Sequence, residues 1–216
     1  PENLARAAAA ASTPDHPVRL IHISTDYVFD GRASEPIPED APVDPVGAYG
    51  RTKAAGERLL ASACATHFIV RTAWLYGIAG KNFVATMLRL MAERDELAVV
   101  ADQVGSPTYA VDLAAALVAF ISRDSTAYGT YHFTNAGETS WHGFAQAIHD
   151  EGRARGILTG ECTVRPISTP EYPTKATRPE YSVLSREKII RELGLTIPPW
   201  KSGLARYLDT YQRNQE

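Results

Sequence analysis

Short apolar runs rich in β-branched residues alternate with longer stretches of helix-like composition, and this alternation most limits how the chain can fold. The predicted strands are residues 18–24, 67–73, 97–101, 130–134 and 162–167. The predicted helices are residues 3–12, 49–63, 82–93, 111–122, 140–150, 185–193 and 201–211. Parallel strands need crossover connections, which are usually helices. The sequence therefore predicts an α/β fold with a largely parallel sheet.

The chain changes character after Gly156, where four prolines interrupt an irregular stretch before the last two predicted helices. We therefore predict a larger α/β unit over residues 1–155 and a smaller lobe over residues 156–216. Loops from 30–48 and 75–110 are expected to interleave with that lobe. The first of these loops is rich in Pro, Gly and Asp, which favour turns over regular structure.

Composition excludes several classes of partner. The 216 residues include 22 Lys and Arg against 25 Asp and Glu, a net charge of -3, so neither nucleic acid nor an anionic membrane surface is an expected partner. No apolar run approaches the roughly 18 residues of a membrane span, and no secretion signal is visible, so a cytoplasmic location is expected. The two cysteines, Cys64 and Cys162, are too few for a disulfide framework or a zinc site and are expected to be reduced.

Tyr49 and Lys53 are four residues apart at the start of a predicted helix, so their side chains project from the same face. A phenol is a weak acid at neutral pH, but a nearby ammonium favours the phenolate and lowers the phenol pKa. The pair therefore forms a tunable proton donor. Taken alone, the spacing is common by chance and fits two exposed helix residues better than a catalytic pair.

Polar side chains follow the first predicted strand in the segment STDYVFDG, residues 24–31. In an open α/β sheet, ligands bind outside the carboxyl ends of the strands. Thr25 is therefore placed to donate a hydrogen bond to a substrate carbonyl. The alternative is that Thr25 and Asp26 only cap the strand and order the loop.

Further segments extend this pattern along nearly the whole chain: PIPEDAPVDPVGAYGRTKAAGE, RTAWLYG, KNFV, DQVGSPTYAVDLA, GTYHFTNAGETSW and RPISTPEYPTKATRPEYSVLS. Together with STDYVFDG, and in this order, they resemble the dTDP-4-dehydrorhamnose reductases of the extended short-chain dehydrogenase/reductase class. The resemblance implies a Rossmann-like, doubly wound sheet with a C-terminal substrate-binding lobe. It also implies reduction of dTDP-4-dehydro-β-L-rhamnose to dTDP-β-L-rhamnose by hydride transfer from NADPH or NADH.

The resemblance assigns the catalytic roles to Thr25, Tyr49 and Lys53. Tyr49 is the expected general acid to the C4 oxygen, and Thr25 is expected to orient and polarise the carbonyl. Lys53 is expected to hold the nicotinamide ribose and to lower the pKa of Tyr49. Ser24, Tyr49 and Lys53 are the expected cofactor contacts.

The candidate substrate-binding residues are Asp26, Tyr27, Trp74, Asn82 and Arg178. The first three occupy motif positions that border the sugar in the family, although Trp74 fits a core position equally well. Asn82 and Arg178 are candidates for the nucleotide and diphosphate, since a guanidinium matches phosphate geometry. The alternative for Arg178 is an ordinary surface ion pair.

The histidines do not suggest a metal site, because none has a Cys or His partner at ligand spacing. His22 lies within the first predicted strand and is expected to be a core histidine with satisfied hydrogen bonds.

Members of the family open with a strand, a Gly-x-x-Gly-x-x-Gly turn and a helix that hold the cofactor pyrophosphate, and nothing in this sequence matches that motif. The sheet is therefore expected to be N-terminally incomplete. We expect the 216 residues alone to bind dinucleotide poorly, to turn over little and to self-associate through exposed apolar surface.

Two alternative functions remain open. Sugar-nucleotide dehydratases and epimerases of the same class share the Thr and Tyr-x-x-x-Lys residues, but dehydratases resemble Thr-Asp-Glu where this chain has Tyr27. The family also has non-catalytic relatives that serve as regulatory subunits of methionine adenosyltransferase.

Overall fold

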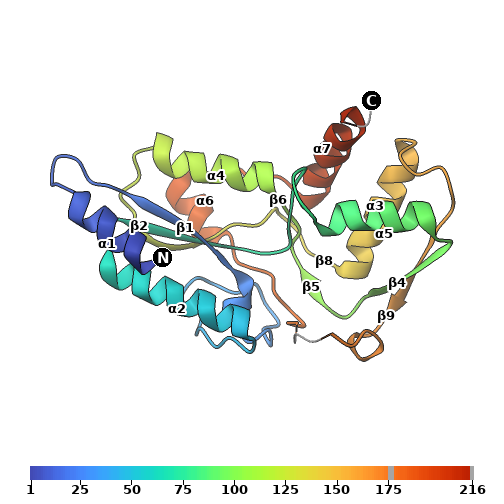
Figure 1. Ribbon diagram of the computed structural model, residues 1–216, viewed down its shortest axis with the longest axis horizontal. Helices are drawn as coiled ribbons and strands as arrows, with labels where there is room; N and C mark the ends of the chain where they lie inside the picture. The colour runs from blue at the N-terminus through green and yellow to red at the C-terminus, as the bar shows by residue number, and fades with distance from the viewer. Residues whose placement is uncertain (175–177, 215–216) are drawn as a thin grey trace.

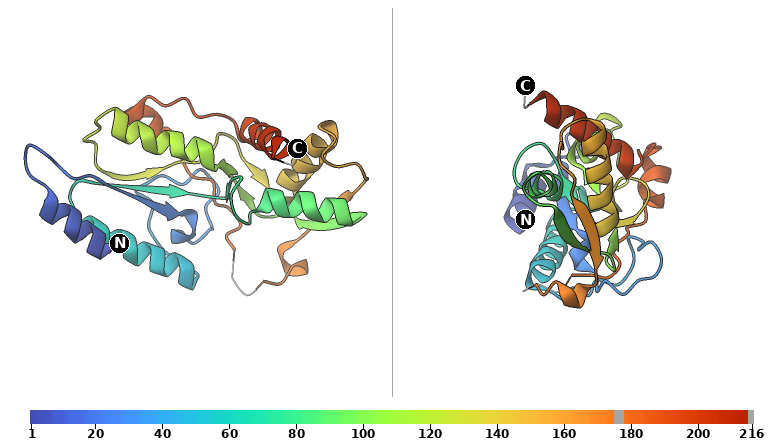
Figure 2. Two further views of the ribbon diagram at one scale, coloured as in Figure 1. Left: turned by 45° about the horizontal axis from the view of Figure 1, so that its top comes forward. Right: turned by 90° about the vertical axis from the view of Figure 1, so that its right-hand side faces the viewer.

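The computed structural model describes residues 1–174 and 178–214, and it has two regions side by side (Figure 1). The first, which we call the sheet region, contains three parallel strands in the order β1-β2-β7, with α1 and α2 on one face and α4 and α6 on the other (Figures 1 and 2). Its strands are β1 (Leu20–Thr25), β2 (His67–Thr72) and β7 (Gly129–His132). Its helices are α1 (Glu2–Ala11), α2 (Ala48–Ala63), α4 (Ala110–Ser122) and α6 (Glu187–Leu193). The predicted α/β fold with mostly parallel strands is confirmed.

Strand β2 shows why helices cover both faces of the sheet. Successive side chains of a strand point to opposite faces. Phe68 and Val70 pack in the cluster formed with α4 and α6, whereas Ile69 packs with α1 and α2. The central strand is therefore buried on both sides, as its uninterrupted apolar sequence predicts.

Strand β1 is partly exposed, although its residue types are those of a strand buried on both faces. Within the described residues it pairs only with β2, and the side chain of Ile23 is 41% exposed. The apolar sequence of β1 indicates a buried strand, but burial also needs a neighbour on the outer edge. His22 is half-buried, and its Nε2 has no hydrogen-bond partner among the described residues, so the expected satisfied core histidine is wrong.

The second region, which we call the aromatic region, is built on a parallel pair of strands, β4 (Glu96–Val100) and β9 (Thr163–Ile167). Three helices complete it: α3 (Phe83–Glu93), α5 (Trp141–Ala154) and α7 (Trp200–Arg213). Aromatic rings dominate its core, where Phe144 contacts the rings of Tyr76, Phe83 and Trp200. This core is closed by contacts among side chains of all three helices.

The structure also contains short elements that the sequence did not predict. They are β3 (Leu75–Tyr76), β5 (Val104–Gly105), β6 (Thr108–Tyr109), β8 (Thr139–Ser140) and the 3-10 turns η1 (Asp26–Val28) and η2 (Thr169–Glu171). Strand β3 pairs in parallel with β6, and β5 pairs in antiparallel with β8. Two residues are too few for a periodic pattern, so only tertiary pairing defines these strands.

The C-terminal part of the chain contributes to both regions. Helix α6 packs on the sheet region, whereas β9 and α7 belong to the aromatic region. The division at residue 155 stays a prediction. No helix within residues 1–174 and 178–214 combines the length and apolar character that crossing a membrane requires.

Candidate active site

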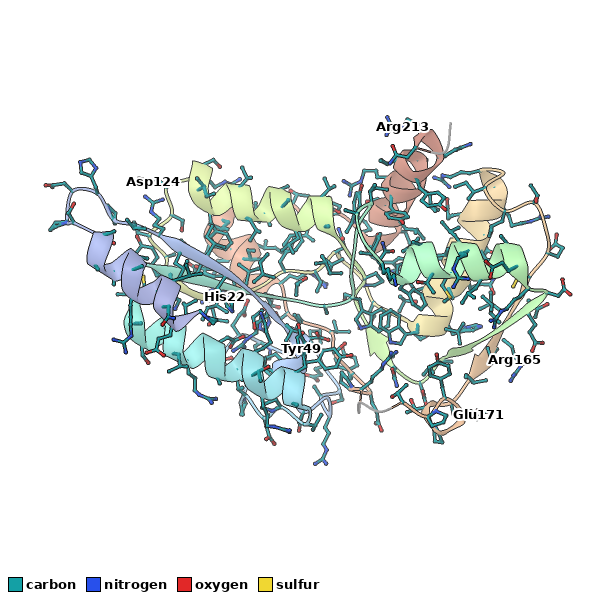
Figure 3. The ribbon with its side chains drawn as sticks, viewed as in Figure 1. His22, Tyr49, Asp124, Arg165, Glu171 and Arg213 are labelled. Carbon is teal, nitrogen blue, oxygen red and sulfur yellow. The ribbon has the colours of Figure 1, made fainter. Side chains whose placement is uncertain are left out.

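Tyr49 and Lys53 lie on the first turns of α2, at the end of the sheet region that faces the aromatic region (Figure 3). The helix begins against the turn η1, because Gly50 has no side chain. A Cβ at position 50 would lie 2.0 Å from the carbonyl oxygen of Tyr27. This close approach brings the rings of Tyr49 and Tyr27 edge to face, with centroids 5.8 Å apart. The Tyr49 side chain is nevertheless open to a ligand, since the residue is 58% exposed.

Lys53 reaches from α2 to the end of β1, where its Nζ donates a hydrogen bond of 2.6 Å to the carbonyl oxygen of Ile23. Partial burial lowers the pKa of Lys53, and the nearby carboxylate of Glu57 opposes this shift. An ammonium has three donors. The others are available to a ligand at this edge of the sheet.

Thr25 and Asp26 form a buried polar pair at the carboxyl end of β1. The Thr25 hydroxyl donates to Asp26 Oδ1 over 2.9 Å and accepts from the backbone N–H of Tyr27 over 3.3 Å. Thr25 therefore does cap the following turn, as the simpler interpretation of this residue expects. Asp26 is only 3% exposed, and this burial raises its pKa to about 6, although the hydroxyls of Thr25 and Ser182 favour the charged form.

Ser24 lies beside this pair with a buried hydroxyl that has no hydrogen-bond partner in the part of the chain that the structure describes. A buried hydroxyl without a partner carries a free-energy cost, which a ligand that accepts or donates a hydrogen bond here would remove. The end of β1 thus offers Ser24, Thr25 and Asp26 together with Tyr49 and Lys53 of α2.

A cavity of about 540 Å³ lies in the aromatic region between α3, β4, β9 and η2. Its wall includes Phe83, Leu97, Val99, Trp141, Tyr172 and Arg178. Arg178 also lies close enough to Tyr27 to lower the pKa of that phenol, which burial raises more strongly. Arg178 thus lines the cavity and lies near the candidate active site.

Trp74 and Asn82 lie in or beside the aromatic region rather than against Tyr49. Trp74 has a left-handed backbone with φ of 47°, and its ring stacks on Trp141 with centroids 3.5 Å apart. A Cβ at Gly105 would come within 2.5 Å of the Trp74 ring. The amide of Asn82 caps α3 by accepting from the N–H of Ala85 and donates to the carbonyl of Gly77. Both side chains therefore have structural contacts that a substrate would add to or replace.

The predicted residues thus fall into two groups. The structure brings together Ser24, Thr25, Asp26, Tyr27, Tyr49 and Lys53. Trp74 and Asn82 are in the other region, and Arg178 lies between the two. The individual roles of all these residues stay predictions.

Sequence reasoning missed Ser182 and Trp141. Ser182 follows a Pro-rich stretch and carries no local signal of its contact with Asp26. Trp141 is the second residue of the predicted helix 140–150, so its place at the start of a helix could be predicted, but its stacking on Trp74 could not. Within the described residues, no three His, Cys, Asp or Glu side chains gather in a way that could hold a metal ion.

Comparison with known proteins gives consistent matches. A family model described as the RmlD substrate binding domain matches residues 1–213. The spore coat polysaccharide biosynthesis protein SpsK of Bacillus subtilis is 44% identical over 190 residues, which cover 88% of this chain and 64% of SpsK. The dTDP-4-dehydrorhamnose reductase of Aggregatibacter actinomycetemcomitans is 43% identical over 193 residues, covering 88% of this chain and 66% of the relative. The chain thus spans slightly less than two thirds of the length of these curated relatives.

Solved structures agree with these relatives. A dTDP-4-dehydrorhamnose reductase from Clostridium acetobutylicum superposes with a TM-score of 0.87 at 44% identity, covering 98% of this chain and 70% of that one. The enzyme of the same name from Bacillus anthracis, in complex with NADP, gives a TM-score of 0.85 at 40% identity, covering 97% of this chain and 69% of that one.

Proposed function

The chain belongs to the RmlD substrate-binding domain family, and we propose that it forms the catalytic and substrate-binding part of a dTDP-4-dehydrorhamnose reductase. The observation that carries the proposal is the meeting of Tyr49 and Lys53 with Thr25 and Asp26 at one edge of the sheet. The proposed reaction converts the C4 carbonyl of dTDP-4-dehydro-β-L-rhamnose into a hydroxyl, giving dTDP-β-L-rhamnose. Relatives that bear the reductase name support this assignment.

The proposed cofactor is NADPH or NADH, which supplies the hydride for C4. The unpartnered hydroxyl of Ser24 and the free donors of Lys53 fit a polar ligand at this edge of the sheet. Tyr49 gives its phenol proton to the C4 oxygen as the hydride arrives, so the carbonyl gains one hydride and one proton. Lys53 favours the phenolate that remains on Tyr49, because its positive charge lies on the same helix face.

Thr25 has a specific part in this scheme. Its single hydroxyl hydrogen is donated to Asp26 in the structure. To donate to the C4 oxygen, Thr25 must release Asp26, whose carboxyl then takes a hydrogen bond from another group or binds a proton. The raised pKa of Asp26, about 6, makes protonation of this carboxyl accessible near neutral pH.

The remaining site residues are proposed to hold the substrate. Arg178 is proposed to meet the diphosphate, because a guanidinium offers phosphate two parallel hydrogen bonds. Asp26, Tyr27 and Trp74 are proposed to border the sugar. Asn82 is proposed to lie near the nucleotide. A cytoplasmic location is part of the same proposal, as is self-association of these 216 residues.

The self-association proposal is supported by apolar side chains at the surface of the sheet region. The outer face of α4 exposes Val111, Val118 and Ile121, and β1 has an edge without a partner strand among the described residues. Exposed apolar patches and bare strand edges favour association.

The reaction is tested with dTDP-4-dehydro-L-rhamnose in a protein that spans the full length of the relatives. We expect NADPH oxidation, and the Tyr49→Phe variant is expected to lower kcat on the order of 10²-fold, because it removes the general acid. Tyr211→Phe, a change on α7 away from Tyr49, serves as the matched control and should leave kcat unchanged. Near-normal kcat in Tyr49→Phe would remove Tyr49 from the mechanism. A wild-type protein that binds NADPH without oxidising it would support the non-catalytic alternative.

A further inference from the structure

Arg71 and Glu57 form a buried ion pair between β2 and α2. Their side chains are 5% and 6% exposed, and the Arg71 Nη2 lies 2.7 Å from Glu57 Oε2. The Nε of Arg71 donates to both oxygens of the same carboxylate. Burying two charges is costly, and well-packed apolar residues at such positions are often as stabilising or more so. Stability alone is therefore a weak explanation for this pair, whereas its two-point geometry fixes orientation.

Glu57 lies on the stripe of α2 that carries the proposed chemistry. It follows Lys53 by four residues and Tyr49 by eight, so the three side chains lie along one side of the helix. The Arg71 guanidinium holds both oxygens of the Glu57 carboxylate. This contact fixes the rotation of α2 about its axis and its position along β2. The same contact therefore sets the positions of Tyr49 and Lys53 relative to the end of the sheet.

Arg71 also contacts the segments that lead into and out of the site. Its guanidinium lies over the ring of Phe29, 5.0 Å from the centroid, at the end of the turn that contains Asp26 and Tyr27. Its Nη1 donates to the carbonyl oxygen of Glu39 over 3.3 Å, in the loop that precedes α2. One side chain thus touches α2, the segment after β1 and the loop that joins them.

His132 completes this cluster from β7. Burial lowers the pKa of His132 to about 3, and the positive charge of Arg71 adds to the effect, so the ring is neutral near pH 7. A neutral imidazole has one donor and one acceptor. Its Nδ1 donates to the carbonyl oxygen of Ile37 over 3.1 Å, and its Nε2 accepts from Arg71 Nη1 over 3.4 Å. The backbone N–H of His132 donates to the Glu39 carboxylate over 3.1 Å. These contacts hold the His132 ring in one orientation, with its Nε2 as an acceptor for Arg71.

We propose that Arg71 is a positioning residue for the proton transfer, aligning Tyr49 and Lys53 through Glu57 and aligning Thr25 and Asp26 through Phe29. This inference rests on the proposed reductase function. Arg71 itself touches neither Tyr49 nor Thr25 among the described contacts, so it acts only through these neighbours.

The test uses a full-length protein with three changes: Arg71→Met, Arg71→Lys and the double change Arg71→Met with Glu57→Leu. Arg71→Met leaves Glu57 buried and unpaired, so both the melting temperature and kcat are expected to fall. The double change removes both charges and is expected to restore the melting temperature. Its kcat is expected to remain on the order of 10²-fold below that of the wild type. Misplacing reacting groups by about 1 Å has an effect of that size. Arg71→Lys is expected to recover part of kcat.

The matched control is Arg89→Met with Glu93→Leu, which removes an exposed ion pair from α3 and should leave kcat and KM unchanged. A double variant whose kcat returns together with its melting temperature would overturn the proposal, because Arg71 would then matter only for stability. An unchanged kcat in Arg71→Met would overturn it as well.

A second measurement separates this inference from the proposed function. Backbone amides of residues 52–57 should exchange hydrogen faster in the double variant Arg71→Met with Glu57→Leu than in the wild type. In that variant the ion pair no longer holds α2 against β2. Equal exchange rates would overturn the positioning role whatever the reaction. A wild type that fails to oxidise NADPH with the dTDP-sugar, yet shows this difference in exchange, would overturn the proposed function and leave the positioning of α2 supported.

Discussion

The sheet region and the aromatic region solve the packing problem in different ways. The aromatic region fills its core with aromatic rings and aliphatic side chains. The sheet region has an open edge at β1 and an apolar outer face on α4, and it buries charged and polar groups between α2 and the sheet. All the residues proposed for proton transfer lie in the sheet region. Apolar packing forms the cavity of the aromatic region, whereas hydrogen bonds and an ion pair position the proposed catalytic residues of the sheet region.

The largest effect that tests this comparison is a core deletion in the aromatic region. Phe144 is fully buried among rings, so Phe144→Ala is expected to lower the free energy of unfolding by about 3–5 kcal/mol, from lost transfer energy and the remaining cavity. Urea unfolding monitored by circular dichroism measures the change. Phe144→Leu, which keeps most of the volume, should cost clearly less. A loss below about 1 kcal/mol would contradict the description of this core as tightly packed.

The second effect concerns the buried carboxyl of the sheet region and depends on pH. Burial raises the folded-state pKa of Asp26 to about 6 from a reference value of 3.8, so between these values the folded state binds more protons than the unfolded state. Its contribution to stability is therefore complete below pH 3.8 and is lost as pH rises through 6. Relative to Asp26→Asn, the wild type should lose at most about 1.4 kcal/mol of unfolding free energy per pH unit over this interval.

The comparison of the wild type with Asp26→Asn removes the contribution of His132 to the pH dependence of stability, because both proteins contain this histidine. That histidine has a lowered pKa and loses stability in the opposite direction, as pH falls below 6.5. Parallel stability curves for the wild type and Asp26→Asn between pH 4 and 6 would show that Asp26 is not held in a desolvated site.

The smallest effect on stability is expected on the open side of the sheet region. Val118 is 57% exposed on α4, so Val118→Ser should change the free energy of unfolding by less than about 0.5 kcal/mol. The same change should reduce self-association of the 216 residues, because it removes apolar surface from α4. Light scattering over a range of protein concentrations measures this, with Ser122→Ala on the same helix as the control. Association that is unaffected by Val118→Ser would place the contact elsewhere.

The sequence predicted the long elements well because each has either a continuous apolar run or a helix-like composition over many residues. The predicted helix 82–93 and strand 67–73, for example, differ from α3 and β2 by one residue at one end. The residue types of β1 are those of a buried strand, but its outer edge has no neighbouring strand among the described residues. Burial of a strand depends on its partners as well as on its own sequence.

The candidate site shows the same limit. Tyr49 and Lys53 are four positions apart on one helix, so their shared face could be predicted from a stretch of five residues. The contact of Arg71 with Glu57 could not, because it joins a strand to a helix and has no local pattern. Ser182 reaches Asp26 only because the C-terminal part of the chain returns to the sheet region. Sequence therefore located the proposed acid and its neighbours at the end of β1, but not the contacts that Arg71, Glu57 and Ser182 make around them.

The pairing of β4 with β9 has a consequence for how the chain folds. Leu97, Val99 and Val100 of β4 are buried in the finished structure, yet the partner strand is made only after α4, β7 and α5. Contacts between segments far apart in sequence form slowly, since the intervening chain must first be closed into a loop. During synthesis, which proceeds from the N-terminus, the apolar side chains of β4 stay without their partner until residue 167 has left the ribosome. The order of the elements therefore fixes how long the apolar side chains of β4 wait for their partner strand during synthesis.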